Sequence, residues 1–290
     1  MPLNLDAIGM VSEPEQRSWT SRDALLYAVA VGAGYPNPLD ELPFTTENSK
    51  DVDQLVLPTL GVLLGSAGAS LQAAMGSFNR AMLVHAEQGI ELFKPIRPDG
   101  TVTVEASLAD IVDKGSGALV IRESTAVDAA TGESVFRTRT GLFIRGEGGF
   151  DPDRGKGEQG ADSSAPAVPD RPADHSVTYE TLANQALIYR LCGDRNPLHS
   201  DPTFAASGGF DRPILHGLCT YGFTGRALLH ALCESDPNRF KSMFGRFTRP
   251  VLPGASLTVD IWVDSGGGGA SFRTTSDGVV VIDRGRCTFT

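Results

Sequence analysis

The sequence predicts an α+β protein built from two similar halves. Three sequence segments recur in the same order in each half. The first begins with Tyr and contains a Gly and an Asn-Pro pair, the second begins with Pro and ends with Gly, and the third begins with Phe and contains Pro and Gly. They occupy residues 27–40 and 189–199, 58–61 and 213–217, and 93–100 and 247–254. Landmarks that recur in a fixed order indicate a duplicated structural unit.

Alternating patterns of apolar and polar residues follow in each half, which is typical of half-buried strands. The clearest such stretches are residues 101–108, 118–127, 257–263 and 279–289. Between the halves, residues 146–174 are rich in Gly, Pro, Ser, Asp and Ala and indicate a linker. We therefore expect an N-terminal repeat at residues 1–145 and a C-terminal repeat at residues 175–290.

A helix is predicted over residues 178–192, because apolar residues recur there at helical spacing (Leu182, Ala186 and Tyr189). Gly193 suits the left-handed position that ends a helix, and Pro197 disfavours a helical conformation at the residue before it. The chain must therefore turn just after this helix.

Asp194 and His199 lie on this turn, five residues apart. An acid and an imidazole held by a sharp bend can face one cavity and act as an acid/base pair. For an isolated pair, the alternative is that the Asp only helps to end the helix and the His is a surface residue. The residues around the pair favour the catalytic interpretation.

The string from Gly193 to His199 reads Gly-Asp-x-Asn-Pro-aliphatic-His, with aromatic Tyr189 before it and small Ala205 after it. It resembles the signature of the R-specific enoyl-CoA hydratases of the MaoC-like, hydratase 2 group. The resemblance implies a double hot dog, two repeats whose antiparallel sheets each wrap around a central helix, with the sheets joined edge to edge. It also implies that Asp194 and His199 activate a water without metal or redox cofactor, and that Asn196 orients the water or Asp194.

Residues 212–222 resemble the family's segment that leads into the next helix. There the backbone N–H of the Gly after His, here Gly217 after His216, hydrogen-bonds the thioester carbonyl. A helix N-terminus offers unpaired N–H groups and a favourable dipole to an enolate-like oxygen. The implied reaction is the reversible hydration of trans-2-enoyl-CoA to (3R)-3-hydroxyacyl-CoA, a hydro-lyase activity, and His216 and Tyr189 are candidate substrate-binding residues.

The two halves are not equivalent. In the first, Ala33 stands where the acid would be and Asp40 replaces the histidine, so the acid/base pair is lost. Fused members of the resembled family use the inert half to accommodate the acyl chain. The small residues of segment 55–82 are consistent with that use, and Gly68 and Ala69 are the candidate contacts.

Charge argues against nucleic-acid binding, since 35 acidic residues outnumber 25 basic ones and the net charge is −10. An anionic CoA carrier must then meet a local cationic patch, for which Arg246 and Arg249 are the candidates. Acyl-CoA or an acyl-carrier-protein thioester is the expected partner, and the family resemblance favours a homodimer.

The spacing of the cysteines fits a reducing compartment, and no targeting signal is evident. Cys192, Cys219, Cys233 and Cys287 have no CxxC spacing, which argues against a zinc site or a disulfide framework. Residues 54–79 carry no charge, but Pro, Gly and polar residues interrupt them, so we expect no membrane span. No signal peptide or C-terminal peroxisomal tripeptide is evident, and the cytoplasm is the expected location.

Three alternatives remain open at this stage. A dehydratase acting on carrier-protein-bound acyl groups would share the same residues. A hot-dog thioesterase would need its acid placed to attack the thioester carbonyl, which the hydratase motif disfavours. A non-catalytic acyl-CoA-binding protein or the silent subunit of a heterodimer is disfavoured because the second half retains both Asp194 and His199.

Overall fold

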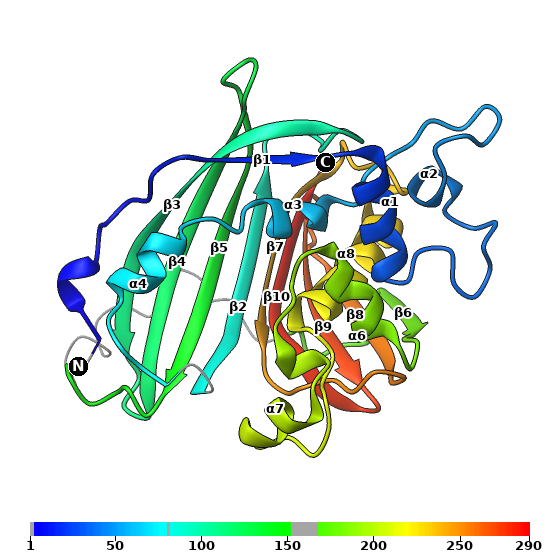
Figure 1. Cartoon of the computed structure of the whole chain (residues 1–290). Coiled ribbons are helices and arrows are strands. Elements are labelled where there is room, and N and C mark those ends of the chain that lie inside the picture. The colour runs from blue at the N-terminus through cyan, green and yellow to red at the C-terminus, as the bar shows by residue number, and fades with distance from the viewer. Residues whose placement is uncertain (1–2, 80–81, 152–167) are drawn as a thin grey trace.

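The protein is described by a computed structural model that covers residues 3–79, 82–151 and 168–290. Within these residues, the strands form one antiparallel sheet in the order β1-β3-β4-β5-β2-β7-β10-β9-β8-β6, shown in Figure 1. The strands are β1 (Glu15–Trp19), β2 (Leu83–Leu92), β3 (Gly100–Asp113), β4 (Gly117–Asp128), β5 (Ser134–Arg145), β6 (His175–Glu180), β7 (Phe240–Phe247), β8 (Ser256–Val263), β9 (Gly269–Ser276) and β10 (Val279–Phe289). All four stretches predicted as strands are confirmed as parts of β3, β4, β8 and β10.

The two halves meet where β2 pairs with β7. Glu87 lies opposite Arg246 and Ile90 lies opposite Met243 in this antiparallel pair. The first five strands in the sheet order precede the linker, and the last five follow it. The expected edge-to-edge junction of two sheets is therefore confirmed, and it places β2 of the first half beside the second half.

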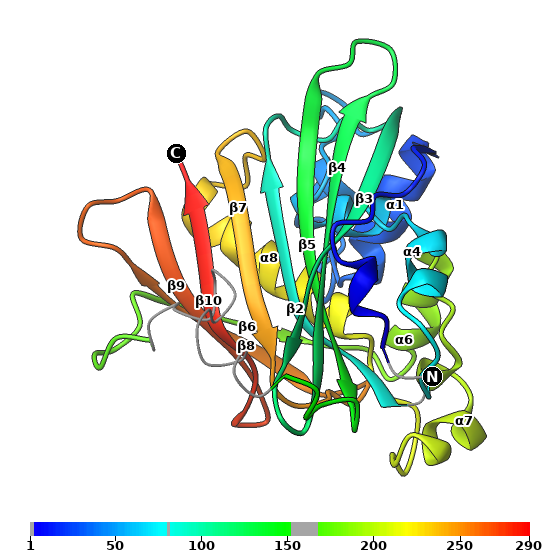
Figure 2. The same ribbon diagram turned by 90° about the vertical axis from the view of Figure 1, so that its left-hand side faces the viewer.

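The central helix is long in only one half. In the second half it is α8 (Gly217–Cys233), whose 17 residues are almost all buried. The corresponding segment of the first half forms only η2 (Pro58–Leu60), α3 (Gly61–Leu64) and α4 (Ala69–Ala74). Figures 1 and 2 show the helices on one side of the curved sheet. The remaining helices are η1 (Leu5–Ala7), α1 (Ser21–Ala30), α2 (Leu42–Thr45), α6 (Gln185–Tyr189), η4 (Arg190–Cys192), η5 (Pro197–His199) and α7 (Pro202–Ser207).

One continuous core unites the halves. The largest buried cluster contains Tyr27 and Phe136 from the first half and Tyr189, Phe223 and Phe272 from the second. Burying a large aromatic side chain removes about 150–250 Å² from water. The site described below is therefore supported by packing from both halves.

The predicted helix over residues 178–192 is wrong in its first part. Residues 175–180 form the edge strand β6, which pairs with β8, and the helix begins only at Gln185. The hydroxyl of Thr178 lies 2.9 Å from that of Thr258 on β8. Pairing with a strand about 80 residues away overrides the local helical spacing, as tertiary context commonly does.

Parts of the linker are anchored to the sheet. The Asp113 carboxylate accepts hydrogen bonds from the backbone N–H groups of Gly149 and Asp151, and the Trp262 indole donates to the carbonyl oxygen of Arg171. Residues 152–167 of the predicted linker lie outside the described residues. Of the helices in the described part of the chain, none combines the length and apolar character needed to span a membrane.

Candidate active site

The turn that carries Asp194 and His199 is built from local hydrogen bonds. Gly193 ends η4 with a φ of 123°, a conformation that favours glycine. The Asp194 carboxylate accepts from the N–H of Asn196 at 3.2 Å, and the Asn196 side chain accepts from the N–H of Leu198 at 3.1 Å. These interactions begin η5, which ends at His199. The sequence motif thus encodes the backbone path that brings the two groups together.

His199 is held in one neutral tautomer. Its Nδ1 lies 2.9 Å from the carbonyl oxygen of Ile214, which can only accept, so Nδ1 carries the proton and Nε2 retains its lone pair. The ring is only 8% exposed. Burial lowers the pKa of His199 and outweighs the opposing effects of the Ile214 hydrogen bond and the Asp194 charge. At neutral pH this imidazole is therefore available to accept a proton.

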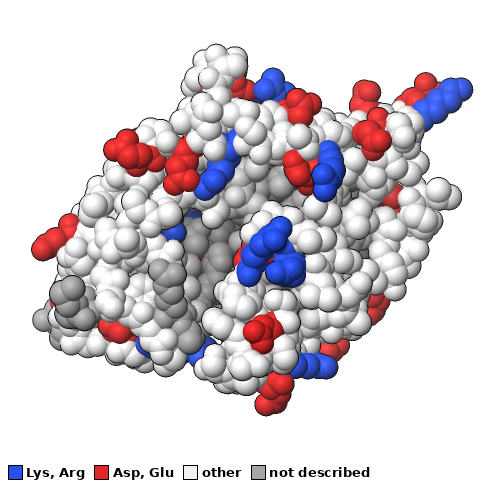
Figure 3. Space-filling view, viewed as in Figure 1, with Lys and Arg blue, Asp and Glu red and all other residues white. Residues whose placement is uncertain are grey.

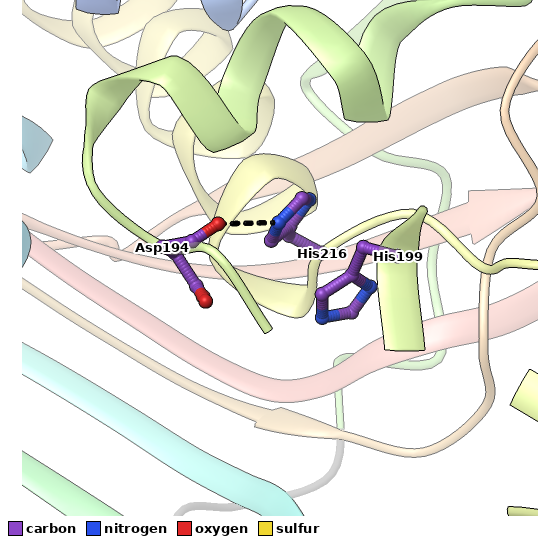
Figure 4. A group of neighbouring side chains, drawn as sticks. All are labelled: Asp194, His199 and His216. Atoms are coloured by element: carbon purple, nitrogen blue, oxygen red, sulfur yellow. Dashed lines mark hydrogen bonds between the residues drawn. The ribbon is translucent and has the colours of Figure 1, made fainter. Parts of the chain in front are cut away.

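Gly217 is the first residue of α8 and lines the same cavity as Asp194 and His199. The first amides of an α-helix have no acceptor within the helix, and they carry the positive end of its dipole. The N-terminus of a 17-residue helix is thus directed at the space beside the acid/base pair. Figure 4 shows how closely Asp194, His199 and His216 approach one another.

The cavity has a volume of about 300 Å³ and receives residues from both halves. Its polar lining residues include Asp194, Asn196, His199 and Thr220, and apolar side chains form most of the remaining wall. The first half contributes Leu83, Val84, His85, Leu142 and Arg145, from β2 and β5. In Figure 3 this face of the molecule is hollowed, and a group of Lys and Arg side chains borders the hollow.

Two predicted substrate-binding residues lie behind this cavity. Tyr189 is 0% exposed and His216 is 1% exposed, and neither lines the cavity. Gly68 and Ala69, the candidate acyl contacts, also lie outside the lining. Gly68 has a φ of +81°, and an added Cβ would lie 3.0 Å from the side chains of Ala106 and Leu71.

The two candidate phosphate contacts differ in their surroundings. Arg246 forms an ion pair with the buried carboxylate of Glu87 at 2.7 Å, across the β2–β7 junction. Arg249 is exposed and lines the cavity. The geometry therefore brings Arg249, but not Arg246, to the Asp194 site.

Asp194, His199 and His216 each offer a possible metal ligand within 4.8 Å of the others. The two imidazole rings are stacked, however, with centroids 3.7 Å apart and planes inclined by 28°. Ring nitrogens direct their lone pairs in the ring plane and bind Zn²⁺ at about 2.0–2.1 Å. Two nearly parallel rings at this separation cannot both direct lone pairs at one ion, so the arrangement fits an acid/base pair better than a metal centre.

Sequence reasoning missed His85 and Arg145, because neither lies in a recognisable motif. His85 donates from Nε2 to the carbonyl oxygen of Glu87 and packs edge-on against Phe247. Burial lowers its pKa to about 4, so it is neutral at pH 7. Arg145, at the end of β5, is exposed at the cavity. The pairing of β2 with β7, and of β5 with β2, brings these residues to the second half.

The cysteines are free and poorly suited to nucleophilic catalysis. Burial raises the pKa of the Cys192 thiol to about 12 and also raises the pKa of the Cys219 thiol well above its ordinary value. A thiol must lose its proton to act as a nucleophile.

The corresponding loop of the first half makes structural contacts with α8. Asn37 repeats the turn of Asn196, since its side chain accepts from the N–H of Leu39. The nearby Glu41 carboxylate, however, accepts from Arg226 at 2.7 Å and from His230 at 2.6 Å, both on α8. This loop is thus fastened to the central helix of the other half.

The sequence is similar to proteins of one family over nearly its whole length. Residues 18–146 match the family model described as MFE-2 hydratase 2 N-terminal domain, and residues 164–283 match that of the MaoC like domain. The 3-hydroxyacyl-thioester dehydratase Y of Mycobacterium tuberculosis is 46% identical over an alignment 295 residues long, gaps included, that covers 98% of each chain. Enoyl-CoA hydratase ChsH3 of the same organism is 38% identical over 271 residues, which cover 91% of each chain.

Solved structures agree with this relationship. A MaoC-like dehydratase from Phytophthora capsici is 33% identical and has a TM-score of 0.85, covering 99% of this chain and 98% of that one. A Mycobacterium tuberculosis protein described as having a double hot-dog fold has a TM-score of 0.59 at 13% identity over 97% of this chain and 96% of that one, and supports the fold alone. The chain therefore belongs to the MaoC-like family of hydratases and dehydratases, which are hydro-lyases, and it has the double hot-dog fold.

Proposed function

We propose that the protein catalyses the reversible hydration of trans-2-enoyl-CoA to (3R)-3-hydroxyacyl-CoA. The observation that carries this proposal is the convergence of Asp194, the bare Nε2 of His199 and the N-terminus of α8 on one cavity. Relatives named as an enoyl-CoA hydratase and a 3-hydroxyacyl-thioester dehydratase support the reaction class.

The geometry suits a single water shared by the pair. The ligand atoms of Asp194 and His199 lie within 4.8 Å, and a water at about 2.8 Å from each of two acceptors spans a similar distance. The water oxygen bonds to C3 while His199 Nε2 takes one of its protons and Asp194 accepts a hydrogen bond from its other hydrogen. His199 then returns a proton to C2, so that one water adds across the double bond without an external reactant.

The Gly217 N–H holds the thioester oxygen in this scheme. As water attacks C3, negative charge develops on that oxygen, and the positive end of α8 stabilises it. Asn196 shapes the turn that leads to His199 rather than reacting itself, since its side-chain oxygen already accepts from the N–H of Leu198. The same groups catalyse dehydration in the reverse direction.

The carrier is proposed to be CoA, with Arg145 and Arg249 meeting its phosphates. The two side chains come from opposite halves, are exposed, and line the same cavity on a chain of net charge −10. The alternative is an acyl-carrier protein, whose prosthetic arm would enter the same cavity.

Hydration of crotonyl-CoA and of a longer trans-2-enoyl-CoA, followed by loss of the enoyl thioester absorbance, tests the proposal. Asp194→Asn and His199→Gln should each lower kcat by about 10²-fold or more while the protein remains folded. Oxidation of the product by a dehydrogenase specific for one enantiomer identifies the stereochemistry. Hydration of the carrier-protein thioester but not the CoA thioester would favour the alternative carrier, and turnover near the parent rate in both variants would reject the assigned roles.

A further inference from the structure

His216 contacts both members of the acid/base pair without reaching the cavity. Its ring stacks on that of His199, and its Nε2 lies 3.1 Å from the backbone carbonyl oxygen of Asp194, as Figure 4 shows. It is also the residue immediately before Gly217, at the N-cap position of α8, where its side chain makes no capping hydrogen bond. The His216 side chain thus contacts Asp194 and His199, and its backbone leads directly into α8.

The hydrogen bond fixes the protonation state of this ring. A carbonyl oxygen can only accept, so His216 Nε2 carries the proton. Its Nδ1 is buried and has no hydrogen-bond partner among the described residues. Burial and the neighbouring His199 lower the pKa of His216, because a second proton would place an unpaired charge in the interior. His216 therefore remains neutral and cannot exchange protons with the substrate, from which it is separated.

We infer that His216 is a positioning residue, which fixes the Asp194 loop through its donated hydrogen bond and fixes the plane of His199 by stacking. The expected effects on kcat rest on the proposed function, whereas the hydrogen bond to Asp194 and the stacking on His199 do not depend on it. Asp194 lies between Gly193 and the Asn-Pro turn, and the bond from His216 holds its backbone carbonyl. A displacement of about 1 Å at a reacting group can cost about 10²-fold in rate.

Stacking and hydrogen bonding can be removed separately. His216→Phe keeps a ring that can pack on His199 but has no donor for the Asp194 carbonyl. His216→Gln keeps an N–H donor but has no ring. His175, an exposed histidine on the edge strand β6, provides matched controls as His175→Phe and His175→Gln.

Both His216 variants should lower kcat by about 10- to 100-fold, with KM changed less than about threefold. Only the Gln variant exposes His199 to water, so only there should the lowered pKa of His199 rise toward its ordinary value. The charged and titratable groups around the pair are Asp194, Arg190, Tyr189, whose ring centroid lies 4.9 Å from that of His216, and His85 in the cavity lining; all are unchanged in both variants. The acid limb of the kcat profile should therefore move to higher pH in His216→Gln and remain in place in His216→Phe.

Titration of His199 by NMR in the folded variants measures the same shift without an assay of activity. An unchanged His199 titration in His216→Gln, or parent kcat in both variants, would overturn the inference. Loss of activity that merely follows loss of folded protein, measured by circular dichroism, would also overturn it. If the parent does not hydrate enoyl-CoA, the proposed function fails, and the NMR titration alone decides whether His216 positions His199.

Discussion

Replacement of Glu41 by Gln should destabilise the protein without removing the catalytic groups. Glu41 lies on the loop of the first half that corresponds to residues 189–199, and its carboxylate pairs with Arg226 and His230 on α8. The Arg226 side chain is 2% exposed, and it also lies 3.8 Å over the ring of Tyr179. Gln keeps an acceptor for these donors but removes the charge that balances a buried guanidinium.

The magnitude follows from the ionisation of Glu41. Burial opposes its charge, but the His230 hydrogen bond, the Arg226 charge and the Gly34 N–H outweigh burial and lower the pKa from 4.5 to about 2. This difference corresponds to roughly 3–4 kcal/mol, at about 1.4 kcal/mol for each pKa unit. We expect a loss of about 2 kcal/mol in the free energy of unfolding, because water still reaches part of the carboxylate and the Gln amide retains a hydrogen bond.

The pH dependence has a definite sign. Because folding lowers the pKa of Glu41, its ionised form stabilises the fold fully above pH 4.5 and progressively less as the pH falls toward 2. Urea unfolding of the parent and Glu41→Gln between pH 7 and pH 3 should show a difference that narrows below pH 4.5. Glu47→Gln, an exposed carboxylate on the same loop region, is the control. A difference that stays constant over this range would refute the reasoning.

Two further predictions concern the substrate. The double variant Arg145→Ala, Arg249→Ala should raise KM for enoyl-CoA by about tenfold or more, as expected for lost charge-assisted contacts worth about 1.5–3 kcal/mol, whereas Arg22→Ala, an exposed arginine on α1, should not. The parent KM should also rise with salt, and a salt-independent KM would contradict the cationic rim. Leu142→Phe should narrow the cavity and lower kcat/KM for a long-chain substrate by about 10-fold or more relative to crotonyl-CoA; equal losses on both would indicate that the acyl chain runs elsewhere.

The proximity of Asp194 and His199 could be predicted from the sequence because their geometry is local. Gly193 supplies the backbone conformation that ends the helix, and Asn196 begins the next turn through its own side chain. Both effects act over a few residues, so spacing along the chain reflects position in space. The duplication and its four strong strands were accessible for the same reason, since alternation is a local signal.

Features that depend on distant pairing could not be predicted in this way. Edge strand β6 obtains its hydrogen bonds from β8, and local helical spacing concealed it. The sequence suggested Arg246 as a phosphate contact. Its actual partner, Glu87, could not be recognised, because it lies 159 positions away in sequence, across the β2–β7 junction. His85 reaches the cavity by the same junction. Apart from β6, which lies at the far edge of the sheet, these features lie at the β2–β7 junction between the two repeats.

We expect that restoring an acid and a histidine at the corresponding positions of the first half would not make that half active. Ala33 is only 5% exposed, and neither it nor Asp40 lines the cavity at Asp194. The segment that corresponds to α8 is broken into the short helices η2, α3 and α4, and Glu41 pairs the loop with α8. In an Asp194→Asn background, Ala33→Asp with Asp40→His should therefore restore no hydration, and the buried new carboxylate should lower the melting temperature. Recovery of turnover would mean that this repeat retains a complete oxyanion site, and that loss of the acid/base pair alone made it inert.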